Sequence, residues 1–135
     1  MRRPSTFIVC CLLVALGTML GQNPEYRPDQ TWHAPNNAAR KVNPLANRPG
    51  AVGGGKKLFL RNCAECHGDG SGIEKKHSAD FQLPVVQDQS DGTIFWKITN
   101  GNTDRGMPSF SKLPELERWQ LVLYVRTLKP VSSPR

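Results

Sequence analysis

The sequence predicts a small all-α domain with long loops, and three observations support this. Apolar residues recur at helical spacing in three segments, at about 54–66, 92–99 and 114–129. No segment has the strict alternation of a half-buried strand. The chain has 135 residues, which leaves room for one domain once its unusual N-terminal part is set aside. We expect that domain at 53–130, followed by a short tail at 131–135.

Residues 1–21 have the pattern of a signal peptide. Arg2 and Arg3 give a positive start, and an apolar run follows at 7–20. This run is shorter than the roughly 20 residues that span a bilayer, which favours a cleaved signal over an uncleaved membrane anchor. In both cases we expect an exported, periplasmic protein, and an uncleaved N-terminus would associate it with the membrane.

The charge is moderately basic, with 18 Lys and Arg against 11 Asp and Glu and a net charge of +7. Removal of residues 1–21 leaves 16 basic residues and a balance of +5. This charge is moderate and does not by itself indicate nucleic acid, because a basic surface would attract acidic proteins or anionic lipids equally well. We expect no nucleic-acid partner. Removal also leaves Cys63 and Cys66 in a compartment where thiols oxidise, so this pair needs a chemical explanation.

Residues 22–52 are polar and rich in Pro, Asn and Arg, without a sustained period. They predict an extended N-terminal arm. Tyr26 and Trp32 are expected to dock on the domain, because a disordered tail has less use for aromatic residues.

The first two helices have an apolar face and a recognisable end. In the first, Gly55, Phe59 and Cys63 lie four residues apart, so the apolar face leads into the cysteine pair. The second is expected to begin with Asp91 as N-cap and to stop at Asn100-Gly101.

The third helix has the clearest signals. Pro114 fits its first position, and Glu115 and Glu117 suit its positive end. Lys129-Pro130 ends it. Its apolar stripe consists of Leu121, Tyr124, Val125 and Leu128.

Three short helices and two long loops, at about 67–91 and 101–113, bury little apolar area in a domain of this size. A large, planar, apolar cofactor would fill the middle of such a domain. The loops would then wrap around the faces of the cofactor.

The stretch "CAECH" at 63–67 allows three kinds of chemistry. Structural zinc needs four ligands, and beyond Cys63 and Cys66 the chain offers only His67, His33 and His77, with no second ligand pair. A redox-active pair would need a strand-helix-strand setting. Haem attachment uses the whole motif: two thiols bond to the porphyrin vinyl groups, and the adjacent His67 becomes an axial ligand of the iron. Haem c is favoured, and His33 and His77 are expected on the surface.

Met107 is the candidate for the second axial ligand. It lies in "RGMPSF", a loop where Gly106 would permit close approach to a porphyrin and Pro108 would stiffen the chain. The alternative is a buried core methionine, the usual role of this residue. A Gly/Pro loop suits core packing poorly, and Met/His is a known axial pair.

Together these motifs resemble the class I c-type cytochromes, the monohaem electron carriers that bacteria export. The resemblance covers about 53–129 and rests on "GGKKLFLRNCAECHGDGSG", "DGTIFWKITNGNTDRGMPSF" and "LERWQLVLYVRTL", in this order. It implies a cytochrome c fold around one covalently attached haem c. In that fold the first and last helices cross, with Gly55 and Phe59 against Leu121 and Tyr124. The resemblance also implies a proline carbonyl that accepts a hydrogen bond from His67, for which Pro84 is the candidate.

With His67 and Met107 both on the iron, no position remains for a substrate, so the expected function is one-electron transfer rather than enzymatic catalysis. The partners would be a quinol- or substrate-oxidising donor and a terminal oxidase or other acceptor. One alternative is a cytochrome subunit of a membrane-bound oxidoreductase complex. Another is a gas-binding or catalytic haem protein in which Met107 is off the iron or easily displaced.

Several basic residues flank the segments expected at the haem. They could form a docking rim for acidic partners or an ordinary solvated surface, and the sequence favours neither. They are Lys56, Lys57, Lys75, Lys76, Lys97, Arg105 and Lys112.

Overall fold

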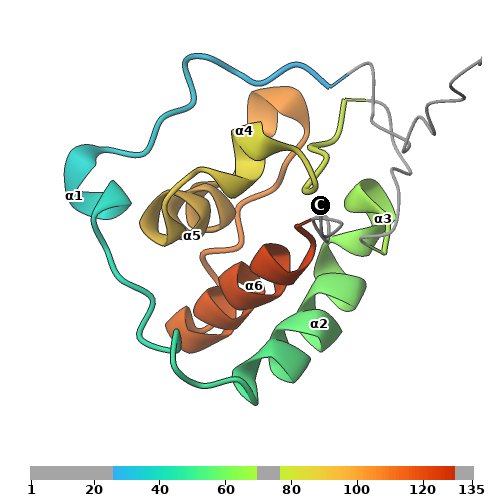
Figure 1. Ribbon diagram of the computed structural model, residues 1–135. Helices are drawn as coiled ribbons and strands as arrows, with labels where there is room; N and C mark the ends of the chain where they lie inside the picture. The colour runs from blue at the N-terminus through green and yellow to red at the C-terminus, as the bar shows by residue number, and fades with distance from the viewer. Residues whose placement is uncertain (1–25, 70–76, 130–135) are drawn as a thin grey trace, which may run out of the picture.

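The computed structural model describes residues 26–69 and 77–129, and within these ranges the regular elements are helices (Figure 1). This confirms the all-α prediction. The predicted signal segment and C-terminal tail lie outside the described residues. The elements are α1 (Asn36–Ala39), α2 (Ala51–Asn62), α3 (Ala64–His67), α4 (Pro84–Gln87), α5 (Asp91–Asn100), the 3-10 helix η1 (Thr103–Arg105) and α6 (Glu115–Thr127).

The contact between α2 and α6 is the most extensive between any two helices. It depends on Gly55, because a Cβ atom there would lie 2.0 Å from the carbonyl oxygen of Gln120. One turn further along α2, the Phe59 ring meets Tyr124 edge to face, with 5.1 Å between ring centroids. The expected crossing of the first and last helices is therefore present.

Helix α5 completes the core on the other side of α6. Phe95 of α5 stacks on Trp119 of α6, with centroids 3.9 Å apart and 16° between the ring planes. Trp119 is 2 % exposed and lies in the core. The buried apolar cluster contains Leu58, Phe59, Ile94, Phe95, Ile98, Trp119, Leu121, Val122, Tyr124 and Val125.

The helix ends differ from the sequence predictions in detail. The first predicted helix is two helices, because the backbone at Cys63 leaves helical geometry (φ −121°, ψ −33°) between α2 and α3. The N-cap of α5 is Ser90 rather than Asp91, since the Ser90 side chain accepts a hydrogen bond from the Thr93 amide at 3.2 Å. Pro114 precedes α6 as its N-cap instead of occupying the first helical position.

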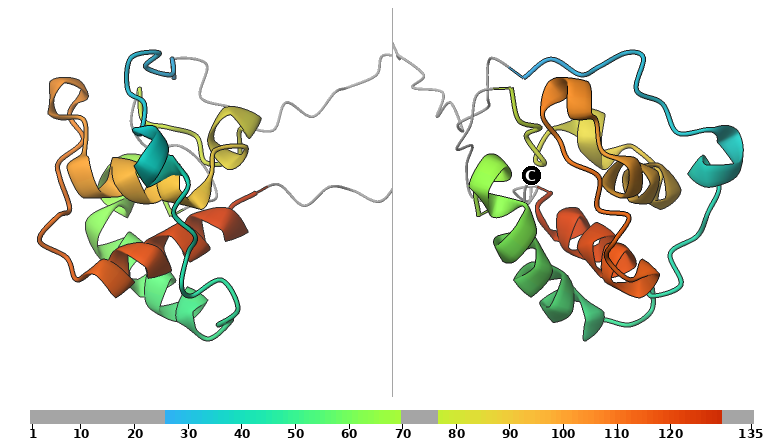
Figure 2. Two further views of the ribbon diagram at one scale, coloured as in Figure 1. Left: turned by 90° about the vertical axis from the view of Figure 1, so that its left-hand side faces the viewer. Right: turned by 180° about the vertical axis from the view of Figure 1, so that it is seen from behind.

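The N-terminal arm packs along α5, on the side away from α2 (Figures 1 and 2). Besides α1 it contains turns at 30–31 and 44–47, joined by irregular segments. Its Asn43 is 2 % exposed and donates a hydrogen bond from Nδ2 to the carbonyl oxygen of Trp119 at 3.1 Å. Where α1 passes over α5, a Cβ atom on Gly92 would lie 2.2 Å from the carbonyl oxygen of Ala38. The arm is thus built into the domain.

Trp32 docks as the sequence predicts, because the Lys97 ammonium lies 4.6 Å from the centre of its ring. Tyr26 is half-buried. Across the described ranges, no helix combines the length and apolar character needed to cross a membrane.

Candidate functional site

The residues 63–67, here called the cysteine–histidine turn, are folded by their own backbone. The Cys63 carbonyl oxygen accepts hydrogen bonds from the amides of Cys66 at 3.1 Å and His67 at 3.0 Å. Gly68 then ends α3 with φ 68°, a left-handed conformation that favours glycine. The turn therefore brings both thiols and the imidazole together within one helical turn.

Both cysteines carry thiols in the structure and are half-buried. Burial raises the pKa of the Cys63 thiol to about 12, and the neighbouring Cys66 adds to this shift.

His67 is oriented by a carbonyl group and an aromatic ring. Its Nδ1 lies 3.3 Å from the carbonyl oxygen of Ala79. A carbonyl can only accept, so Nδ1 carries the proton and Nε2 keeps its lone pair. The His67 ring also lies on Phe81, with centroids 4.6 Å apart. Burial lowers the pKa of the imidazole, which favours the neutral form that binds metals.

The carbonyl beside His67 belongs to Ala79, which corrects the assignment of this role to Pro84. Pro84 begins α4, and its carbonyl oxygen accepts the Asp88 amide at 2.8 Å within that helix. The residue that takes this role is decided by the path of the chain between 77 and 84, which the motif does not encode.

Met107 lies on a separate segment of the chain, residues 101–110, here called the Met107 loop. Its amide donates to the carbonyl oxygen of Asn102 at 2.9 Å, and the Asn102 amide donates back to the carbonyl oxygen of Met107 at 2.9 Å. Met107 is half-buried. This pair of hydrogen bonds closes the segment that contains η1 into a small ring.

The same loop is fastened to the end of α5. Phe110 donates its amide to the carbonyl oxygen of Ile98 at 3.1 Å, and Ser109 Oγ donates to that of Thr99 at 2.7 Å. Gly101 makes this approach possible: its φ is 67°, and a Cβ atom there would lie 2.5 Å from the backbone of Pro108. The backbone position of Met107 is consequently well defined.

These residues fit a covalently attached haem. Two thiols lie one turn apart, and the neighbouring imidazole presents an unprotonated Nε2. The carbonyl on its other nitrogen is the usual means of fixing the orientation and basicity of a histidine ligand. A thioether on a fixed loop supplies a candidate for the second axial position.

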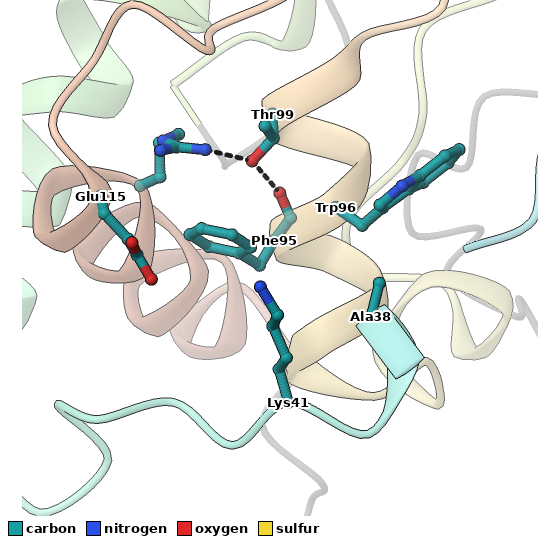
Figure 3. Close-up of a pocket in the computed structure, with 7 residues that line it drawn as sticks. Ala38, Lys41, Phe95, Trp96, Thr99 and Glu115 are labelled. Atoms are coloured by element: carbon teal, nitrogen blue, oxygen red, sulfur yellow. Dashed lines mark hydrogen bonds between the residues drawn. The ribbon is translucent and has the colours of Figure 1, made fainter. Parts of the chain in front are cut away.

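A small cavity of about 230 Å³ lies elsewhere, in the seam between the arm, α5 and α6 (Figure 3). Ligand sites usually measure about 300–1,000 Å³. Figure 3 shows Lys41 beside the Phe95 ring, where its ammonium is 5.9 Å from the ring centre. Trp96 also lines this seam. We interpret the cavity as imperfect packing where the arm meets α5 and α6, and not as a ligand site.

The basic residues that could form a docking rim are only partly exposed. Lys56, Lys57, Arg105 and Lys112 are exposed, whereas Lys97 is half-buried against Trp32. Lys75 and Lys76 lie outside the described residues. His33 and His77 are exposed, in agreement with their predicted place on the surface.

Sequence reasoning missed the residues that support the ligands. Ala79 and Phe81 contact His67, and Asn102 pairs with Met107. Their residue types carry no functional signal, because two of the contacts use backbone atoms and the third uses an ordinary apolar ring. Only the "NGN" turn before Met107 marks a bend there.

Comparison with protein families gives a match to a cytochrome family. The model described as "Cytochrome C oxidase, cbb3-type, subunit III" matches residues 50–125. No curated protein and no solved structure matches the chain significantly. The match covers the cysteine–histidine turn, the Met107 loop and nearly all of α6, while the arm lies before it.

Proposed function

The chain belongs to the family of subunit III of cbb3-type cytochrome c oxidase, and on that premise we propose that it carries single electrons in a periplasmic respiratory or dehydrogenase-linked chain. Membership means that it binds one covalently attached haem c and takes part in haem-based electron transfer. We propose Cys63 and Cys66 as the attachment residues, with His67 and Met107 as the axial ligands. Export through the signal pattern at 1–21 would place the protein in the periplasm.

The single observation that carries the proposal is the hydrogen bond between His67 Nδ1 and the carbonyl oxygen of Ala79. It fixes the tautomer that leaves Nε2 able to bind iron, directly beside two thiols in the same turn. The haem supplies an iron that cycles between the ferric and ferrous states. The chain supplies attachment, ligands and burial, and methionine ligation raises the reduction potential.

The second candidate function is a subunit of a membrane-bound oxidoreductase complex. The description of the matching family, which names an oxidase subunit, favours it. In this case the redox partners would be held by assembly instead of by diffusion. Release of the protein by osmotic shock would indicate a free carrier, whereas co-purification with membranes and oxidase activity would indicate a subunit.

Carbon monoxide binding by the reduced protein tests the proposed ligands. The protein is produced in a host that matures c-type haem and is followed by absorption spectroscopy, with Met107→Ala alongside. We expect the wild type to have a far lower affinity for carbon monoxide than the variant, because only the variant has an open sixth position on the iron. Ready binding by the wild type would contradict the proposal and favour a gas-binding or catalytic haem protein.

A further inference from the structure

The N-terminal arm lies before the matched region and has no role in the proposed function, yet it contacts the Met107 loop. Asn102 Nδ2 donates a hydrogen bond to Asp29 Oδ2 at 3.0 Å, across 73 residues of sequence. Asn102 is also the residue whose backbone pairs with Met107 in both directions. One residue therefore links the arm to the candidate ligand.

We propose that Asp29 is a positioning residue, which holds Met107 in place for the haem iron by fixing Asn102. The inference rests on the proposed function, because it takes Met107 as the axial ligand. Asp29 itself would not touch the haem. Its role would be to limit the displacement of the loop that presents the thioether.

The Asp29 carboxylate is held firmly enough to act in this way. Its Oδ1 accepts hydrogen bonds from the Thr31 amide at 2.9 Å and from Thr31 Oγ1 at 2.7 Å, which leaves Oδ2 for Asn102. These hydrogen bonds, together with the charge of Arg105, lower the pKa of Asp29 to about 2. The group is thus an ionised acceptor at neutral pH, and bonds to charged acceptors are stronger than neutral ones.

The arm is also anchored along its length, so Asp29 does not sit on a loose end. The Lys97 ammonium lies over the Trp32 ring, and Ser90 Oγ donates to the carbonyl oxygen of Ala39 at 2.6 Å. Further on, the buried Asn43 bonds to the backbone of α6. Contacts from Asp29 to Asn43 hold the arm across α5, and Asp29 contacts the Met107 loop.

The contact should matter for ligand retention because a methionine loop can detach while the haem stays covalently bound. Loss of the Asp29–Asn102 hydrogen bond removes the tie between the loop and the arm. The contacts at Ile98 and Thr99 would remain. We therefore expect the Met107 ligand to be displaced more easily, without loss of haem.

The test compares the full-length, haem-loaded wild type with Asp29→Ala, Asn102→Ala and the double variant. Two properties are measured: the carbon monoxide affinity of the reduced protein, and the pH at which the ferric protein loses the near-infrared charge-transfer band of methionine ligation. We expect each single variant to bind the gas about five- to tenfold more tightly than the wild type. This ratio corresponds to the net contribution of one hydrogen bond. Both should also lose the band at lower pH.

The matched control is Asp104→Ala, which removes the same charge from η1 in the Met107 loop itself. Asp104 is exposed and takes no part in the Asp29–Asn102 contact. It should behave as the wild type. Asp29→Asn keeps an oxygen acceptor without the charge, and its values should lie between those of the wild type and Asp29→Ala, which a general folding defect would not produce.

The double variant decides whether the two residues act together. If they do, its gas affinity should equal that of either single variant. Additive effects, or single variants that match Asp104→Ala, would overturn the proposal while leaving the electron-carrier function intact. A wild type that binds the gas as tightly as Met107→Ala, or that lacks the methionine band, would overturn both.

Discussion

The cysteine–histidine turn is closed by hydrogen bonds between residues three or four apart, whereas the Met107 loop is held by contacts that reach across the chain. The turn needs only Cys63 and its neighbours to form. The loop needs the end of α5, the left-handed Gly101 and Asp29 of the arm. One half of the site is therefore encoded locally, and the other is a product of tertiary structure.

This difference suggests that the two halves should fail separately. Damage to the turn should abolish haem attachment, while damage to the loop should leave the haem bound but change its sixth ligand. The predictions below probe each half in turn.

The largest effect is expected from Cys63→Ala combined with Cys66→Ala. Without either thiol no thioether can form, so the protein should carry no haem through a denaturing gel stained for haem peroxidase activity. Met107→Ala, which damages the loop half, should retain the full stain. Haem that remained bound to the double cysteine variant under these conditions would place the attachment site elsewhere.

A smaller effect is expected from Gly101→Ala, because the added Cβ meets the Pro108 backbone and the residue has a positive φ. We expect a loss of about 3 kcal/mol in the free energy of unfolding, from the left-handed backbone and the steric clash together. Denaturant titration of the haem-loaded protein measures it, and carbon monoxide binding should show that the sixth position has opened.

Gly106→Ala is the matched control for this loop. Gly106 also has a positive φ, of 83°, but a Cβ atom there would have nothing within 4 Å. Among the protein atoms only the backbone cost of about 1 kcal/mol remains, so the loss should be smaller than that of Gly101→Ala. Equal losses for the two variants would show that the close approach of Pro108 to Gly101 is unimportant.

The smallest effect is expected from Pro84→Ala, which removes the proline ring at the start of α4 but keeps the backbone carbonyl. Because the carbonyl at His67 Nδ1 belongs to Ala79, this substitution should leave the reduction potential unchanged. The free energy of unfolding should fall by less than about 1 kcal/mol, the contribution of a proline at the first position of a helix. A large shift in potential would show that the start of α4 also influences the position of His67.

The same contrast explains how far the sequence could be interpreted. Periodicity located α2, α5 and α6, because this signal repeats along one face of a helix. The contact of Gly55 and Phe59 with α6 was implied by the resemblance to class I c-type cytochromes. The break at Cys63 was missed, since nothing in its neighbours forbids a continuous helix. The motif at 63–67 allowed Cys63, Cys66 and His67 to be predicted as haem-binding residues, because all of its chemistry lies within five positions.

The remaining parts of the site could not be predicted in this way. Ala79 contributes a backbone carbonyl, which every residue has, so only the folded path selects it. The link between Asp29 and Asn102 joins two common polar residues 73 positions apart. The composition of the arm suggested an extended segment with docked aromatic residues. It gave no sign that Asn43 of the arm is buried and bonded to the backbone of α6.

The route of the arm also has a mechanical consequence. The described chain enters the domain beside the Met107 loop, passes along α5, and reaches the start of α2 last. Tension applied at Tyr26 would therefore act first on the Asp29–Asn102 contact, and so on the loop that holds Met107. That tension would reach the cysteine–histidine turn only after the arm had separated from α5.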